Sequence, residues 1–168
     1  GASDGVAVQT VGSTSYFLVG EWSPALVRYS TAGVKDTTFA TGQTGVHRAI
    51  LVVGTSTAQR IFAGATNDFK RYTANGALEA TVAMGSQVNA LATQTISGTD
   101  YVLVGGVFGF GPYHNHEKLN GVTGLPVPGT QFNLGCGGYG GLVVGPEGHG
   151  IAAWLNQHGI TGVVLEYR

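Results

Sequence analysis

Cysteine, proline and charge are all scarce in this chain. Its 168 residues include one Cys and five Pro, and charged residues make up only 10%. The single Cys136 excludes an internal disulfide, which needs two sulfurs, and leaves the redox compartment open. A net charge of -1 provides no positive field to hold nucleic acid or an anionic membrane. No apolar run approaches the roughly 18 residues of a membrane span, so we expect neither kind of partner.

Glycine is plentiful instead, at 29 residues, and the segments between the glycines are rich in Val, Thr and aromatic residues. Val, Thr and aromatic side chains favour strands, while Gly favours tight turns. The composition therefore predicts a mainly β structure rather than disorder.

A repeat of about forty residues runs through the first part of the chain. Its copies open at Val6, Val46 and Val88. Each continues with an apolar run, a short strand with a basic residue, a turn and a Thr-rich strand. The apolar runs are YFLVGEW (16–22), RIFAGAT (60–66) and YVLVGGVF (101–108), and the basic strands are LVRYS (26–30), FKRYT (69–73) and HEKLN (116–120). The Thr-rich strands are KDTTFAT (35–41), LEATVAM (78–84) and PGTQF (128–132).

Each copy is thus predicted to hold about four strands, which is the size of one propeller blade. The apolar second strand should be buried on both faces. Asn75-Gly76 is the clearest hairpin turn, because both residue types accept positive φ. We expect propeller-like blades at about 6–44, 46–87 and 88–132. Three blades are too few to close a ring, and their open edges favour self-association.

The segment ALVRYSTAGVKDTTFATG (25–42) resembles the delta-sixty repeat, a β-propeller-type repeat of bacterial surface and secreted proteins. Asp36-Thr37-Thr38-Phe39 stands where that repeat carries Asp-Thr-Ser-Phe, and Val104-Gly105-Gly106 stands where it carries Val-Gly-Gly. The resemblance covers about residues 1–132. It implies an extracellular or cell-surface location in a bacterium and brings no catalytic residues.

The sequence pattern changes near residue 133, where the glycine-rich segment NLGCGGYGGLVVGPEGHG stands in place of the start of a fourth copy. A helical stretch is predicted from Gly148 to His158, with Pro146 suiting its first turn and Gly159 its end. An apolar strand at 160–167 would follow. We therefore expect a short βαβ segment over 133–168, distinct from the β-repeats of 1–132.

This tail resembles the first part of an α/β hydrolase of the acetylxylan-esterase or acyl-esterase kind. The matching residues are Gly137-Gly138-Tyr139-Gly140-Gly141, Pro146-Glu147-Gly148, Ala153-Trp154-Leu155 and Tyr167-Arg168. The resemblance implies that Gly137, Gly138 and Tyr139 lie at an oxyanion hole. The nucleophile, acid and His of such an enzyme would follow beyond Arg168, so no complete catalytic set is expected within 1–168.

Three further patterns point to simpler structures. Gly135-x-Gly137-x-x-Gly140 fits a dinucleotide fingerprint, but the helix should start at the last glycine, so we expect no cofactor. His114 and His116 could share one strand face as weak metal candidates, but no third ligand is evident, and no metal is predicted. Gly54-Thr55-Ser56-Thr57-Ala58 is similar to a nucleophile elbow, but it lies between two predicted strands and is expected to be a turn.

The leading expectation is a non-catalytic β-repeat segment for binding or scaffolding in a surface or secreted protein, carrying an incomplete hydrolase-like tail. The alternative is the N-terminal part of a modular carbohydrate esterase, for which a G-x-S-x-G after a further strand would be the evidence. The ligand is unknown, with carbohydrate and protein both open.

Overall fold

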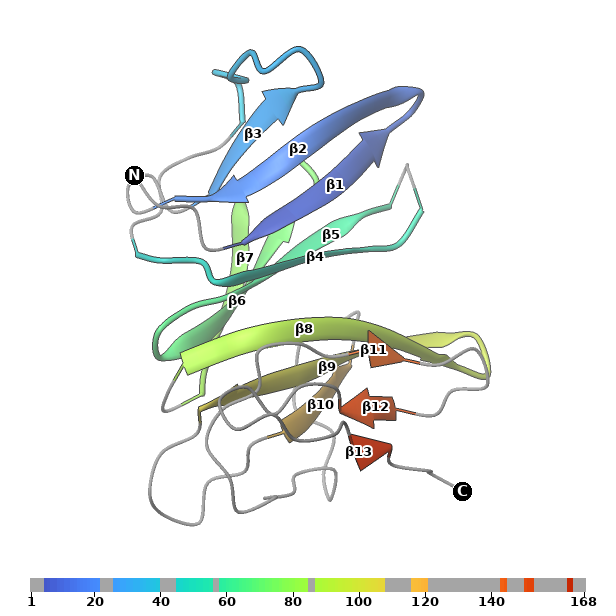
Figure 1. The fold of residues 1–168 in the computed structure, drawn as a ribbon. Coiled ribbons are helices and arrows are strands. Elements are labelled where there is room, and N and C mark those ends of the chain that lie inside the picture. Colours follow the sequence, from blue (N-terminus) through green and yellow to red (C-terminus); the bar gives the residue numbers. More distant parts are fainter. Residues whose placement is uncertain are drawn as a thin grey trace. The chain divides into compact units, whose positions relative to one another are not determined.

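The computed structural model describes residues 5–21, 26–39, 45–55, 58–84 and 87–107, together with the backbone of four short strands farther along the chain. The chain divides into two compact units, residues 1–83 and 84–168. The described residues form a mainly β structure of antiparallel sheets, as predicted, and contain no helix (Figure 1). No closed barrel or propeller is formed by the described strands.

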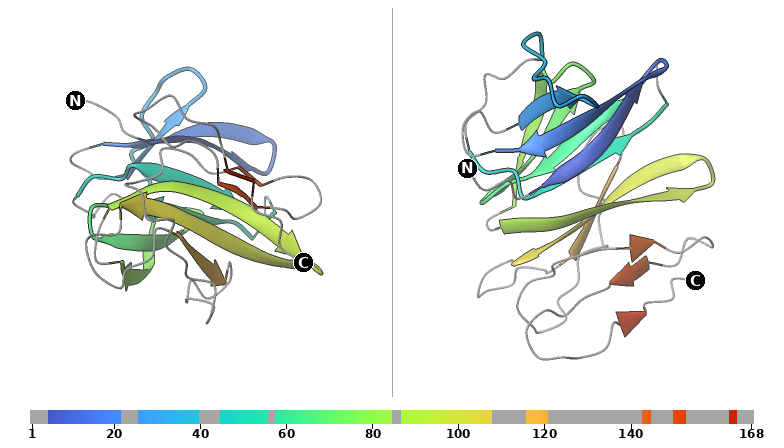
Figure 2. Two further views of the ribbon diagram at one scale, coloured as in Figure 1. Left: turned by 60° about the horizontal axis from the view of Figure 1, so that its bottom comes forward. Right: turned by 45° about the horizontal axis from the view of Figure 1, so that its top comes forward.

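The first unit contains two sheets. The first sheet has the order β1-β2-β3, and the second sheet has the order β4-β5-β6-β7. Their strands are β1 (Val6–Val11), β2 (Thr14–Gly20), β3 (Leu26–Ser30), β4 (Ala49–Val53), β5 (Arg60–Gly64), β6 (Asp68–Thr73) and β7 (Leu78–Ala83). The two sheets lie face to face, and the views in Figure 2 show the first sheet over β4 and β5.

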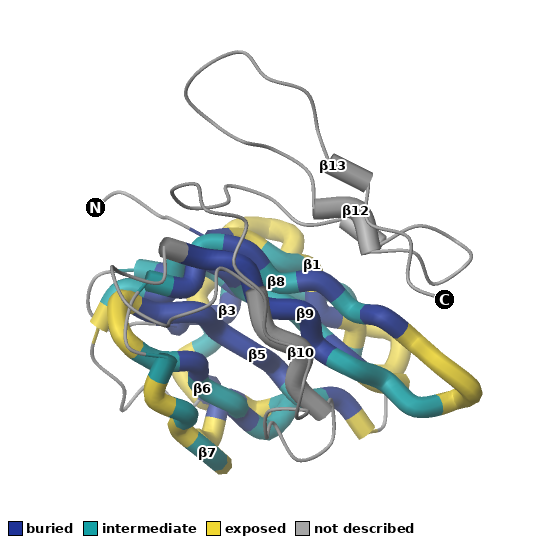
Figure 3. The backbone as a smooth tube through the Cα atoms, turned by 90° about the horizontal axis from the view of Figure 1, so that it is seen from below, coloured by how far each residue is buried: buried dark blue, intermediate teal, exposed yellow. Residues whose placement is uncertain are grey.

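The core of the first unit forms between these two sheets. One half comes from the first sheet and the segment after it, with Leu18, Leu26 and Phe39 almost fully buried. The other half comes from the second sheet: Ile61, Ala63, Tyr72, Ile50 and Val52. Burial follows the strands, while exposed residues gather at the turns (Figure 3). The alternation of side chains along each strand places these residues on the two facing surfaces.

The two sheets are built as copies of one pattern. Gly20 pairs with Leu26 in the first sheet as Gly64 pairs with Phe69 in the second. The turn after the third strand of each copy also repeats, because the backbone N–H of Gly33 donates to Ser30 and that of Gly76 donates to Thr73. Both glycines have positive φ, 78° and 83°. The strands and turns of the predicted repeat therefore recur among the described residues between 5 and 83. The predicted start of the second copy at Val46 is wrong, because the register matches Val6 with Ile50.

Two further details of the predicted repeat are wrong. The Thr-rich strand predicted at 35–41 is reduced, within the described residues, to an isolated bridge between Lys35 and Tyr29. The carboxylate of Asp36 accepts bonds from the backbone and hydroxyl of Thr38, which turns the chain away from the sheet. Asn75 also lacks the predicted positive φ, which in this loop belongs to Gly76 alone.

The second unit begins with a third sheet of order β10-β9-β8, made by β8 (Gln87–Ile96), β9 (Thr99–Val107) and β10 (His116–Asn120). The strand predicted at 116–120 is confirmed. The strand predicted at 128–132, like the boundary predicted at 132/133, lies outside the described residues. Ser97 and Gly98 join β8 to β9 with φ of 50° and 77°, as a two-residue hairpin loop requires.

The predicted βαβ segment is not supported. Residues 150–152, inside the predicted helix, form strand β12 (Gly150–Ala152). It pairs antiparallel with β11 (Val143–Val144) and with β13 (Val163–Val164), whereas a βαβ unit needs parallel strands. Gly148 and Gly150 are poor helix residues, and a short apolar run such as Ile151-Ala152 fits a strand as well as a helix. The other residues of 145–162 lie outside the description.

Gly20 offers a test of how closely the two sheets of the first unit approach. A Cβ atom at Gly20 would overlap the backbone carbonyl oxygen of His47. We predict that Gly20→Ala lowers the free energy of unfolding by about 2 kcal/mol, since backbone must move to make room.

The control is Gly12→Asn. Gly12 has φ of 60° and nothing near its missing Cβ, and Asn tolerates this conformation, so the loss should stay below about 1 kcal/mol. Urea denaturation of both variants measures the difference. Equal losses would show that the close approach at Gly20 does not matter.

Candidate binding surface

The residues predicted for catalysis or metal binding fall mostly outside the described part of the chain. Gly137, Gly138, Tyr139 and His114 all lie there. His116 opens β10 and pairs with Gly105 along the backbone, but its side chain is not described. Within the described residues, no three His, Cys, Asp or Glu side chains form a group that could hold a metal ion.

The segment similar to a nucleophile elbow is a turn, as predicted. It connects β4 to β5, and the backbone N–H of Ala58 donates to the carbonyl of Thr55 at 3.0 Å. Gly54 has φ of 100°, and its missing Cβ would meet the carbonyl of Ala58. Ser56 lies outside the described residues. The turn lacks the strand-to-helix setting that a nucleophile elbow needs, because it joins two paired strands.

A buried polar network joins the two sheets of the first unit. The guanidinium of Arg28 donates to the carboxylate of Asp36 at 2.6 and 2.9 Å and to the side-chain oxygen of Gln9 at 3.2 Å. Arg28 also donates to the backbone carbonyl of Ala74 at 3.3 Å, and the amide of Gln9 donates to the same carbonyl at 2.8 Å. The first copy of the repeat is thereby tied to the turn of the second.

The same guanidinium lies over two aromatic rings. Its central carbon is 4.5 Å from the centre of the Tyr16 ring and 4.8 Å from that of Phe39. A guanidinium that lies over aromatic rings and pairs with a carboxylate has its positive charge stabilised by both kinds of contact. The bonds from Thr38, together with Arg28, lower the pKa of Asp36 to about 2, which keeps the pair charged. Residues 36–39 therefore serve the packing of Arg28.

The first unit contains a second buried polar contact. His47 and Tyr72 are nearly inaccessible, and a ring nitrogen of His47 lies 2.6 Å from the Tyr72 hydroxyl. Burial lowers the pKa of His47 to about 4, and the positive charge of Lys70 acts in the same direction. Burial also raises the pKa of Tyr72. His47 is therefore neutral near pH 7 and holds the second sheet to the segment that precedes it.

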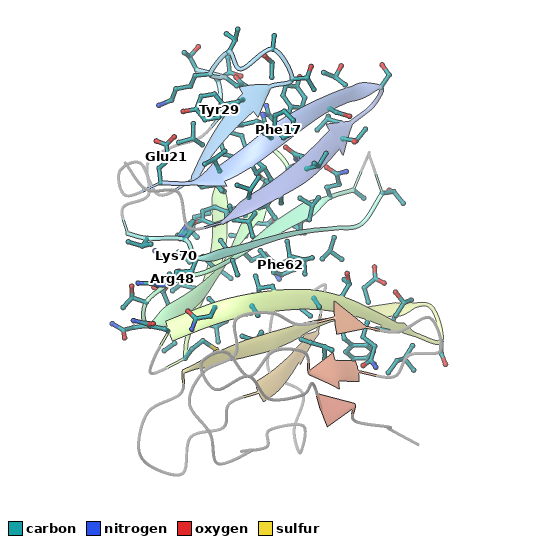
Figure 4. All side chains as sticks on the ribbon, in the orientation of Figure 1. Phe17, Glu21, Tyr29, Arg48, Phe62 and Lys70 are labelled. Carbon is teal, nitrogen blue, oxygen red and sulfur yellow. The ribbon has the colours of Figure 1, made fainter. Side chains whose placement is uncertain are left out.

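The outward side of the first sheet is the surface available for binding. We call it the outer face and define it by Val6, Val8, Phe17, Val19 and Tyr29. The register places them together, because Val6 faces Val19, Val8 faces Phe17, and Phe17 faces Tyr29 across neighbouring strands. The same side of the sheet also carries Val27, which faces Val19 and is fully buried, and the hydrogen-bonded pair Thr10 and Ser15. Directly opposed residues of an antiparallel pair share one face of the sheet. Figure 4 shows Phe17 and Tyr29 on the side turned away from the second sheet.

Large apolar side chains are exposed on this outer face. The exposed fractions are 62% for Val6, 59% for Val8 and 40% for Phe17. Tyr29 is half-buried and donates its hydroxyl to the carboxylate of Glu21 at 2.8 Å, a bond that raises the Tyr29 pKa. Clustered exposed apolar side chains with a polar margin are typical of a surface that another molecule covers. The expectation that the second strand of each copy is buried on both faces is therefore wrong for β2.

Comparison with models of known protein families finds no match to this sequence, and no curated protein matches it. The described residues include no helix that is long and apolar enough to cross a membrane.

The role of Arg28 can be tested against its counterpart in the second sheet. Arg71 also pairs with an acidic residue, Glu79, at 3.0 Å. We predict that Arg28→Ala lowers the free energy of unfolding by about 3 kcal/mol, because Gln9 and Asp36 lose a buried partner. Arg71→Ala should cost less than Arg28→Ala, since the Arg71 side chain is 17% exposed and that of Arg28 is 8% exposed. Equal losses in urea denaturation would contradict the assigned role.

His47 predicts a specific dependence of stability on pH. Its pKa is near 6.5 when unfolded and about 4 when folded, so the unfolded chain binds more protons between these values. Stability is full above pH 6.5 and falls by up to about 3 kcal/mol as the pH drops to 4. Lys70 and Asp68 are the charged groups that influence the ring.

The measurement is urea denaturation of the native chain and of His47→Gln at pH 7, 5.5 and 4.5. The glutamine can still bond Tyr72 but does not titrate, so the variant should lose less stability between pH 7 and 4.5. Asp36 does not interfere, because its contribution is lost only below about pH 4. Parallel pH profiles would show that His47 is not the group responsible.

Proposed function

We propose that this chain is a non-catalytic β-repeat segment that binds another protein, as part of a surface or secreted protein of a bacterium. The observation that carries the proposal is the outer face of the first sheet, a row of exposed apolar side chains on a rigid, repeated framework. The location rests on the resemblance of residues 25–42 to a repeat of such proteins.

Protein is favoured over carbohydrate by the chemistry of the outer face. Val6, Val8 and Val19 offer no hydrogen-bonding side chain, and Glu21, at its margin, is already bonded to Tyr29. A sugar needs several polar groups that replace its bonds to water, whereas a protein surface can cover an apolar row with its own apolar residues.

The buried polar groups of the first unit support a scaffold. Arg28 bonds Asp36 and Gln9, Arg28 and Gln9 both bond the turn of the second sheet, and His47 bonds Tyr72. The contacts with the turn and the contact of His47 with Tyr72 join segments that are distant in the sequence, which stiffens the sheet that presents the outer face.

Lysine substitutions at matched positions of the two sheets test whether the outer face is a free surface. Val8 and Phe17 of the first sheet correspond to Val52 and Ile61 of the second, which lie in the core between the sheets. We predict that Val8→Lys and Phe17→Lys each change the free energy of unfolding by less than about 1 kcal/mol. Ile61→Lys should cost more than about 4 kcal/mol, because it buries an unpaired charge.

Urea denaturation measures these changes, and fluorescence of the dye bis-ANS reports the apolar surface. The dye signal of the native chain should fall in Val8→Lys and Phe17→Lys. A large loss of stability in these two variants would mean that the outer face is covered within the chain itself, and would contradict the proposal.

A further inference from the structure

We propose that the partner covering the outer face is another β-sheet of this same repeat, one that carries counterparts of Leu18, Leu26, Gln9 and Arg28. This inference rests on the proposed function only in needing the outer face to be a free surface, and it assigns that surface to a neighbouring repeat. It follows from comparing two equivalent surfaces of the first unit, one of which is already covered.

The first surface is the face of the second sheet that packs against the first sheet. Its residues are Ile50, Val52, Ile61, Ala63 and Tyr72. Register matching assigns each a counterpart in the first sheet, because Gly64 corresponds to Gly20 and Phe69 to Leu26. The counterparts, in the same order, are Val6, Val8, Phe17, Val19 and Tyr29, which together are the outer face.

The covered surface shows what its occupant provides. Leu18, Leu26 and Phe39 of the first sheet and its following segment pack on the second sheet. A sheet seated in the same way on the outer face would place residues like Leu18 and Leu26 over Phe17 and Val19. Val6 and Val8 are 62% and 59% exposed, whereas their counterparts Ile50 and Val52 are partly buried against the core. The contrast is sharpest for Phe17, which is 40% exposed, because its counterpart Ile61 is fully buried.

The polar contacts of the covered surface have a counterpart as well. The carbonyl of Ala74, in the turn of the second copy, accepts bonds from Gln9 and Arg28 of the first copy. The matching residue in the first copy is Thr31, which is exposed and lies in a turn with the same backbone bonds and a glycine of the same φ. A docked sheet would therefore direct a glutamine and an arginine at the Thr31 carbonyl.

A duplicated chain tests this directly. A second copy of residues 1–44 is placed immediately ahead of Gly1. The new junction then matches the one between residues 44 and 45, because Gly1 corresponds to Gly45. The original Phe17, whose counterpart Ile61 is fully buried, is changed to Cys and Cys136 to Ser, and the rate of maleimide labelling is measured with and without the added copy. We expect at least about tenfold slower labelling in the duplicated chain, since the thiol becomes accessible only when the sheets separate.

Two matched variants make the result specific. Val34→Cys should label at the same rate in both chains, because Ala77, its counterpart in the covered copy, is exposed. Leu18→Lys in the added copy alone should restore fast labelling of Phe17→Cys, because Leu18 is fully buried between the sheets.

Equal labelling of Phe17→Cys with and without the added copy would overturn the inference. The inference would also be overturned if the added copy gained no amides protected from hydrogen exchange, because docking should fold that copy. If labelling of the unduplicated chain became slower as its concentration rose, a second molecule of the chain would be covering the outer face. That result would likewise overturn the inference. Slow labelling in the unduplicated chain at every concentration would instead refute the proposed function, so the two failures are distinguishable.

Discussion

The first unit depends on one buried arginine. Arg28 donates to Asp36, Gln9 and the Ala74 carbonyl, and its guanidinium lies over the rings of Tyr16 and Phe39. A buried guanidinium is tolerated only when its charge and its donors are matched, so these neighbours are constrained in identity as well as position. Together they set the spacing between the two sheets and give the turn at 74–76 its place.

The repeat, its strands and its turns could be predicted from the sequence because they depend on local chemistry. The strands predicted at 26–30 and 116–120 form over those residues, and Gly33 and Gly76 take the positive φ that a turn glycine permits. The fourth strand of the first copy could not be predicted correctly, because Asp36 has two competing uses. It could continue the sheet, but its carboxylate bonds Thr38 and Arg28 instead.

The binding surface was harder to predict, because burial is decided by what lies opposite a strand. YFLVG and RIFAG have the same apolar character, yet Phe17 is 40% exposed and Ile61 is fully buried. The network around Arg28 did leave one sequence signal: Gln9 interrupts the apolar alternation of VAVQTV on the side that faces inward. The helix predicted at 148–158 depended on a short apolar stretch that suits either structure, and part of it is a strand.

The two sides of the first sheet are chemically different, and this gives any stack of such sheets a direction. The inward side carries Leu18, Gln9 and Arg28, while the outward side carries Val6, Val8 and Phe17, so like sides do not complement each other. Head-to-tail contacts of this kind do not terminate themselves, unlike the paired contacts of a symmetric dimer. A stack of these repeats therefore needs an end piece whose outward side is polar. One lysine on β1 would be enough to convert a sheet that accepts a neighbour into one that ends the array.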